Sequence, residues 1–514
     1  MKKRCRLSAL LSVCSLLLLT ACTPAAEEPT PSLPTPGVEE ESPRQVEFAL
    51  CYDSSQPLDP LSTANTVNLA LAGLVYEGLF ELDQTFTARP LLCDSYSVRA
   101  DGLVWTFVLR SDVTFSDGTP LTAAHAAAAL NTARRSGQYA SRMTPVTAVK
   151  AVDALTLTVT LSTPVAQLPA LLDIPITLSG PEDAPLGTGP YAYARTEDGL
   201  KLTANPLWWQ GHSLPMDSIP LRAVSSAGDQ VAAFDTGLSS VVSSDPTSTN
   251  ALGFSGSYET WTAPTTSMLY LGFRCSSGQC ADPVLRRAIS MAVDRDTLAS
   301  SLFSGYADAA SLPVSPASPL YDTQLADALR GSPAQAIDLL TGGGYTLSQD
   351  GTLLKWRKAV SLTLLVSSEN SFRLAAARSI ADSLSALGIT VTVKALPWPD
   401  FLNALQRGDF DLYLAQTKLT ANFDLSALLT GELNYGGYWN SDINALLAAF
   451  RAAGDQSSAS ALYTALAGES PFTPLCFTRT AVLARWGTVS GAAPTQQNPF
   501  YHFYTWELPR EVTA

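Results

Sequence analysis

Charged residues are scarce in this sequence of 514 residues: only 15% are Asp, Glu, Lys or Arg, whereas about 25% is usual. Hydrophobic residues make up 46%, so the chain as a whole does not have the composition of a disordered protein. Basic residues are fewer than acidic ones, 32 against 46, and the formal net charge is −14. Nucleic-acid-binding proteins usually carry a basic footprint, so this balance argues against a nucleic-acid partner.

Residues that carry common catalytic and metal chemistry are also few. The sequence has three histidines, His125, His212 and His502, and none lies near another at the spacing of a metal site. The HExxH, P-loop and GxSxG motifs are all missing. We therefore predict that the protein is not an enzyme and that it binds no cofactor and no metal of its own.

Long apolar runs are missing too, except at the N-terminus. Beyond the first 22 residues no run of 18 apolar residues occurs, so no spanning helix is expected there. Residues 1–21 combine four basic residues with the apolar stretch Leu7–Ala21, which is typical of an export signal. The signal ends in Leu19-Thr20-Ala21-Cys22, which resembles a bacterial lipobox.

The lipobox resemblance implies cleavage before Cys22, lipidation of Cys22 and anchoring on the outer face of the bacterial cytoplasmic membrane. Two acyl chains suffice for stable attachment. The alternative is an ordinary signal peptide with a chance cysteine. Residues 22–43 continue as an acidic, Pro-rich segment without a basic residue, which predicts a disordered tether between the lipidated cysteine and the globular body.

Five cysteines follow Cys22, and an odd number excludes a fully paired disulfide framework. Cys275 and Cys280 could close a short disulfide around Gly278, or they could remain two unpaired thiols. Their spacing is not that of a zinc site.

Periodicity predicts strands and helices that alternate along most of the chain. Leu103–Arg110 and Ala154–Leu161 have the composition and alternation of strands, whereas Thr122–Arg135 and Phe372–Leu387 have the pattern of helices. Ile389–Ala395 then predicts a strand directly after a helix. This alternation favours an α/β architecture with partly parallel sheets.

Several motifs follow one another in a fixed order. They are Val75-Tyr76-Glu77-Gly78-Leu79, Trp105-Thr106-Phe107 after Asp101-Gly102, Asp112–Leu121, Gly187-Thr188-Gly189-Pro190-Tyr191, Asn205-Pro206 with Trp208-Trp209, and Leu285-Arg286-Arg287-Ala288-Ile289 with Asp294-Arg295. Together they closely resemble the family 5 solute-binding proteins of ABC importers, a group that includes oligopeptide-, dipeptide- and nickel-binding receptors. Residues 74–123 carry the densest match, and the resemblance extends over roughly residues 45–510.

The resemblance implies an α/β, two-lobed, periplasmic-binding-protein-like fold of type II, with an extra domain inserted in the first lobe. The chain would pass between the lobes near Trp261–Leu271 and Pro474–Leu483. The implied parts are a signal peptide at 1–21, the lipidated cysteine and tether at 22–43, domain I of the first lobe at 44–73, 180–262 and 480–514, domain II at 74–179, and the second lobe at 263–479.

The implied function is capture of a solute outside the cytoplasm, with delivery to the permease subunits of an ABC importer. Peptides are the leading substrate class, and we expect a monomer. Receptors for a nickel chelate, a sugar or an opine are alternatives within the same class. A surface enzyme and a scaffold are the alternatives from other classes.

Candidate ligand contacts lie in the second lobe. Peptide receptors of this family often follow one strand with Gly-Trp-x-x-Asp, whose Asp binds the peptide ammonium. Here Gln416-Thr417 and Thr420 stand at those positions, Lys418 adds a positive charge, and Asp424 is the nearest carboxylate. We hypothesise that Asp424 takes the ammonium contact; the alternative is that it caps a helix beginning near Leu425. Four aromatic residues in predicted loops are further candidates, with packing or surface exposure as the alternative: Trp398, Tyr435, Tyr438 and Trp439.

Overall fold

The computed structural model describes residues 47–180, 184–197 and 199–508. The predicted signal peptide, Cys22 and the tether lie outside the described residues. Within the described residues, no helix is both long enough and apolar enough to cross a membrane.

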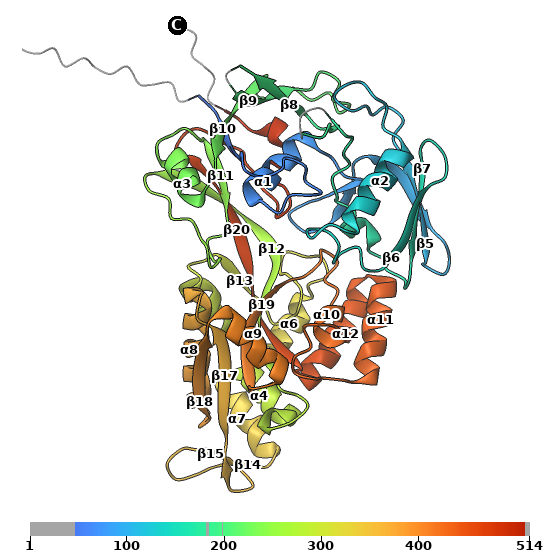
Figure 1. Ribbon diagram of the computed structural model, residues 1–514. Helices are drawn as coiled ribbons and strands as arrows, with labels where there is room; N and C mark the ends of the chain where they lie inside the picture. The colour runs from blue at the N-terminus through green and yellow to red at the C-terminus, as the bar shows by residue number, and fades with distance from the viewer. Residues whose placement is uncertain (1–46, 181–183, 198, 509–514) are drawn as a thin grey trace, which may run out of the picture. The chain divides into compact units, whose positions relative to one another are not determined.

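A four-stranded sheet forms the part of the fold nearest the beginning and end of the described chain (Figure 1). Its order is β1-β10-β9-β8, with β1 parallel to β10 and the other pairs antiparallel. Helix α1 packs beside β1 and β8, and its buried side chains join those of the sheet in one hydrophobic cluster. The elements are β1 (Leu50–Asp53), α1 (Thr66–Val75), β8 (Tyr191–Thr196), β9 (Gly199–Ala204) and β10 (Ser218–Val224).

A second four-stranded sheet, wholly antiparallel, has a core of its own. Alternate residues of β5, namely Trp105, Phe107 and Leu109, are buried, as period-two side-chain alternation requires. Helix α2 covers this sheet and starts with a capping box between Thr122 and His125, so His125 has a structural partner. The elements are β4 (Cys93–Val98), β5 (Val104–Leu109), α2 (Ala123–Ala133), β6 (Val146–Ala151) and β7 (Thr156–Leu161).

A seven-stranded mixed sheet organises the rest of the chain. Its strands β17, β18 and β19 are parallel neighbours, and hydrophobic clusters pack against it. The path β11-β20-β12-β19-β17-β18 has β13 added beside β20. The strands are β11 (Val241–Ser244), β12 (Tyr258–Phe273), β13 (Ala307–Ala309), β17 (Ser361–Ser367), β18 (Thr390–Leu396), β19 (Leu412–Lys418) and β20 (Phe472–Arg485).

Strands β12 and β20 are unusually long and run side by side in antiparallel register (Figure 1). Strand β12 contains Trp261–Leu271 and strand β20 contains Pro474–Leu483, the two ranges in which the sequence predicts that the chain passes between lobes. Their register shifts between Pro264 and Met268, and there the hydroxyl of Thr265 donates to the backbone O of Thr478 at 2.5 Å. The predicted domain boundaries themselves stay predictions.

Of the two alternatives for Cys275 and Cys280, a disulfide or two unpaired thiols, the structure has the unpaired thiols. Cys275 and Cys280 are both free, and so are the other three described cysteines. Cys280 is buried in the core beneath β12, and burial raises the pKa of its thiol well above the usual value. Among the residues that the structure describes, no group of three or more His, Cys, Asp or Glu is placed to hold a metal ion.

Candidate ligand cavity

A cavity of about 940 Å³ lies where the first four-stranded sheet meets β12 and β20. Its wall includes α1, β2 (Phe80–Leu82) and the segment 495–504, and the long sheet contributes Thr265, Ser267, Lys418 and Thr480. Binding pockets for small molecules commonly enclose about 300–1,000 Å³. The space is therefore sufficient for a small organic solute or a short peptide.

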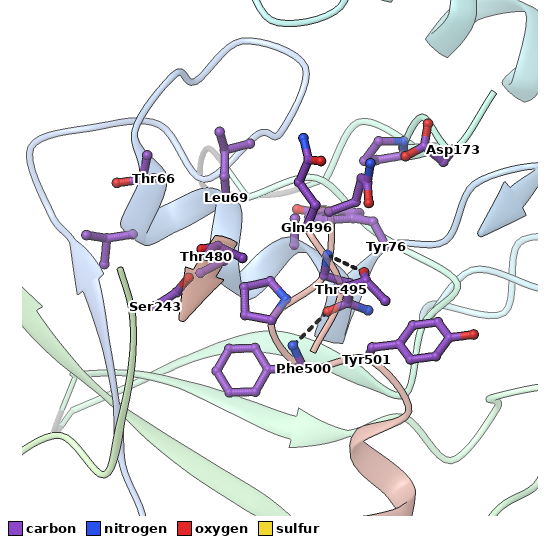
Figure 2. Close-up of a pocket in the computed structure, with 18 of the residues that line it drawn as sticks. Thr66, Leu69, Tyr76, Asp173, Ser243, Thr480, Thr495, Gln496, Phe500 and Tyr501 are labelled. Atoms are coloured by element: carbon purple, nitrogen blue, oxygen red, sulfur yellow. Dashed lines mark hydrogen bonds between the residues drawn. The ribbon is translucent and has the colours of Figure 1, made fainter. Parts of the chain in front are cut away.

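The segment 495–501 is folded into a hydrogen-bonded turn at the cavity wall (Figure 2). The hydroxyl of Thr495 accepts a hydrogen bond from the backbone N–H of Asn498 at 3.1 Å, and the Asn498 side chain accepts one from Phe500 N–H at 2.9 Å. The side-chain oxygen of Gln496 accepts from the N–H of Thr266 at 2.7 Å. These bonds attach the cavity wall to the irregular part of β12.

A buried carboxylate, that of Glu77, forms part of the cavity wall. Glu77 is 6% exposed and accepts four hydrogen bonds, from the side chains of Thr188, Trp208, Trp209 and Gln210 at 2.7–3.1 Å. Burial raises the pKa of Glu77, although these four bonds act in the opposite direction. The motif around Glu77 therefore meets the motifs that contain Thr188 and Trp208-Trp209 in one hydrogen-bonded cluster.

Close backbone packing explains the first glycine of the motif Gly187-Thr188-Gly189-Pro190-Tyr191. A Cβ atom at Gly187 would lie only 1.9 Å from the backbone O of Val75, at the end of α1. Glycine is the one residue without that atom. This motif therefore seats the chain against the helix that forms part of the cavity wall.

Three charged side chains that line the cavity come from distant parts of the chain. Lys418 ends β19, Arg142 follows α2, and Asp173 follows the short 3-10 helix η1 (Leu168–Leu171). The Arg142 guanidinium is paired with the Asp173 carboxylate. The side chain of Lys418 is open to the cavity, yet surrounding protein desolvates its ammonium and thereby lowers its pKa; Arg142 lowers it further and Asp173 opposes this.

Of the six predicted ligand contacts, all of them described residues, Lys418 alone lines this cavity. Trp398 is the first residue of helix α9 (Trp398–Arg407) and stacks on Phe401 rather than standing in a loop. Trp439 is exposed to solvent on 75% of its surface. Tyr435 packs edge-to-face against Tyr413.

The last two of the six also have protein partners. Tyr438 is buried in a core cluster. Asp424 accepts hydrogen bonds from the backbone N–H and hydroxyl of Ser426 and pairs with Arg451. The ligand roles of these residues stay predictions. Sequence reasoning overlooked Arg142, Asp173 and the 495–504 segment, because no local motif marks residues that meet only after folding.

Comparison with known proteins places these features in context. Residues 87–431 match the model of the bacterial extracellular solute-binding proteins, family 5. The glutathione-binding protein GsiB of Salmonella typhimurium is 28% identical over 305 residues, which cover 56% of this chain and 59% of GsiB. GsiB of Shigella flexneri is 27% identical over the same share. The chain thus spans less than two thirds of the curated relatives that it matches.

Solved structures share the fold over almost the whole described chain. A nickel ABC transporter protein from Bacillus halodurans superposes with a TM-score of 0.71 at 21% identity, covering 88% of this chain and 98% of that one. The oligopeptide-binding protein AppA from Bacillus subtilis, solved with a nonapeptide, gives a TM-score of 0.58 at 20% identity, covering 90% and 98%. At these identities the likeness establishes the fold.

Proposed function

This chain belongs to the bacterial extracellular solute-binding proteins of family 5, and we propose that it captures peptides for an ABC importer. Members of this family are solute-binding receptors of ABC importers rather than enzymes, and the predicted two-lobed α/β fold is confirmed. The finer proposal is that the protein is lipid-anchored through Cys22, binds a peptide between its lobes and presents it to a membrane permease.

The cavity is the observation that carries the peptide proposal. Its volume of about 940 Å³ exceeds the needs of a single ion, and its wall combines hydroxyl, amide, aromatic and charged side chains. Peptides offer many backbone donors and acceptors that such a wall satisfies without reading side chains specifically. Solved proteins of the same fold include one that holds a nonapeptide, and curated relatives bind glutathione, itself a tripeptide.

Native mass spectrometry of the purified mature protein tests this proposal. The protein is incubated with a defined pool of tri- to pentapeptides, with a nickel–histidine chelate and with a neutral disaccharide in separate samples. We expect one-to-one complexes with members of the peptide pool. A complex with the chelate or the disaccharide, combined with none from the peptide pool, would contradict peptide capture.

A further inference from the structure

One carboxylate of the cavity wall, that of Glu81, lies among side chains of the segment 495–504. Side chains alternate along β2, so Phe80 and Leu82 are buried, whereas Glu81 keeps 26% of its side-chain surface exposed. Its Oε1 atom lies 3.5 Å from the hydroxyl oxygen of Tyr501 and 3.3 Å from Nε2 of His502. All three of these residues line the cavity. The carboxylate is therefore within reach of a solute held there.

Two tyrosine rings accompany this carboxylate. The ring of Tyr501 stacks on the imidazole of His502 with 3.9 Å between centroids, and the ring of Tyr504 lies 5.3 Å from the same imidazole. Both tyrosines are partly exposed and line the cavity. Figure 2 shows the Tyr501 ring directed away from the turn that contains Thr495 and Phe500. This part of the wall thus combines a carboxylate with aromatic surface.

The charges around Glu81 do not cancel. Arg89, on strand β3 (Ala88–Pro90), is its cross-strand partner, but the Arg89 guanidinium binds Asp83 at 3.0 Å instead. Within the described part of the chain, no Lys or Arg nitrogen lies within ion-pair distance of Glu81. His502 adds a positive charge only when it is protonated. Two carboxylates and one guanidinium therefore leave one negative charge at this part of the wall.

The two tyrosine hydroxyls respond to the same negative charge. Burial raises the pKa of Tyr501, and the charges of Glu81 and Asp83 raise it further. Burial likewise raises the pKa of Tyr504, and Glu81 adds to the effect. A carboxylate partly removed from water is stabilised by a nearby cation. This point of the cavity therefore favours a positively charged group of the ligand.

We propose that Glu81, Tyr501 and Tyr504 form a subsite for a basic side chain, lysine or arginine, of a bound peptide. The Glu81 carboxylate accepts hydrogen bonds from the ammonium or guanidinium, and the tyrosine rings pack against the methylene stem. Basic side chains suit this wall because their stems bury on apolar surface while their charged ends bind polar groups. An α-ammonium group offers the charge without the stem. The inference rests on the proposed function, since it assigns a class of peptide to that cavity.

Peptides that differ in one side chain test the subsite. For each member of the tri- to pentapeptide pool that binds, analogues are prepared with lysine and with norleucine at each position in turn. Norleucine keeps the four-carbon stem and lacks the ammonium, and the α-ammonium is the same in both analogues. Calorimetry measures the affinities of the wild-type protein. At one position or more, lysine should bind about 10- to 100-fold more tightly than norleucine, because a charge-assisted hydrogen bond is lost without the ammonium.

Variants at Glu81 assign the preference to this side chain. Glu81→Gln keeps the shape and an acceptor for the Tyr501 hydroxyl but removes the charge, so it should bind the lysine and norleucine peptides within about threefold of each other. Glu432→Gln is the matched control, because Glu432 is exposed and does not line the cavity, and it should keep the full preference for lysine. Thermal unfolding of each variant checks that the fold is intact.

The outcomes separate this subsite from peptide capture itself. If lysine and norleucine peptides bind the wild-type protein equally, the subsite is overturned while peptide capture stands. The subsite is also overturned if Glu81→Gln keeps the preference, or if it weakens both kinds of peptide by one factor, as loss of an α-ammonium contact would. If no peptide binds, peptide capture fails and the subsite fails with it. Should Glu81→Gln not fold, Glu81→Asp withdraws the carboxylate by one methylene and should lower the preference; an unchanged preference would overturn the subsite.

Discussion

The carboxylate of Asp424 lies 3.2 Å from Nε of Arg451, and Arg451 in turn donates a hydrogen bond to the hydroxyl of Thr163 at 2.7 Å. The backbone carbonyl of Arg451 also accepts a bond from Ala166 N–H at 2.8 Å. Asp424 thus helps to hold an arginine that joins the helix α11 (Ser441–Ala453) to the loop after β7. Its carboxylate is occupied by the protein itself.

We predict that Asp424→Asn leaves peptide affinity within about twofold. Asn retains an oxygen for the Ser426 N–H at the start of α10 (Ser426–Leu429), and only the partly exposed ion pair with Arg451 is lost. The free energy of unfolding should fall by about 1 kcal/mol, near the upper end of the range for ion pairs at protein surfaces, because the pair is partly exposed. Calorimetric titration and urea unfolding measure the two quantities.

Asp409→Asn is the matched control for Asp424→Asn, because Asp409 forms an exposed ion pair with Arg407 at 2.7 Å. A loss of affinity of about 10- to 100-fold on Asp424→Asn alone would instead support an ammonium contact of Asp424.

Glu77→Gln should destabilise the protein. The carboxylate accepts from four donors, and a Gln side chain offers one oxygen while turning its NH₂ group toward indole and amide donors. We expect the free energy of unfolding to fall by about 1–3 kcal/mol, measured by urea denaturation at neutral pH. Glu432→Gln is the control, since Glu432 is exposed, and it should change the free energy by less than about 0.5 kcal/mol.

The wild-type protein and Glu77→Gln also differ in how their stability depends on pH. The pKa of Glu77 is raised in the folded state, so the folded protein binds its proton more readily than the unfolded chain does. The part of the stability that comes from binding this proton is therefore fully present below the usual Glu pKa of about 4.3 and is lost as pH rises through the folded-state pKa, whereas the hydrogen bonds of the side chain remain. The free energy of wild type minus that of Glu77→Gln should decrease as pH rises from about 4. An increase over that window would contradict a raised pKa.

Membrane attachment depends on Cys22 if the lipobox interpretation is right. Cys22→Ala removes the thiol that would be lipidated, so the variant should be released or retained as precursor, whereas the wild type fractionates with membranes. Immunoblots of membrane and soluble fractions of expressing cells distinguish the two. Cys51→Ala serves as a control, because Cys51 is a free, buried thiol of β1. Identical fractionation of wild type and Cys22→Ala would remove the support for lipidation.

Ligand binding should make the protein more compact. The long strands β12 and β20 are irregular at Pro264–Met268, and closure by a hinge needs only a few residues to change their backbone angles. Small-angle scattering with and without a peptide shown to bind should give a smaller radius of gyration for the complex. An unchanged radius at saturating peptide would argue against hinge closure.

Local features of this protein were largely predictable from the sequence. The alternation in Ala154–Leu161 matches strand β7, and the turn and strand motifs around Trp105 identify the family, because both depend on residues close in the chain. Element bounds were less accurate: Trp398 begins a helix although a loop was predicted, since Pro at the second helical position is compatible with a helix start.

The candidate site shows where prediction from the sequence stops. Family membership follows from the order of short motifs along the chain. The absence of common catalytic motifs is likewise read directly from the sequence. The grouping of Lys418 with Arg142 and Asp173 was decided only by the tertiary structure, as was the attachment of Gln496 to Thr266. Charge complementarity in a cavity depends on distances between residues remote in the chain, and side-chain periodicity along one strand or helix carries no information about those distances.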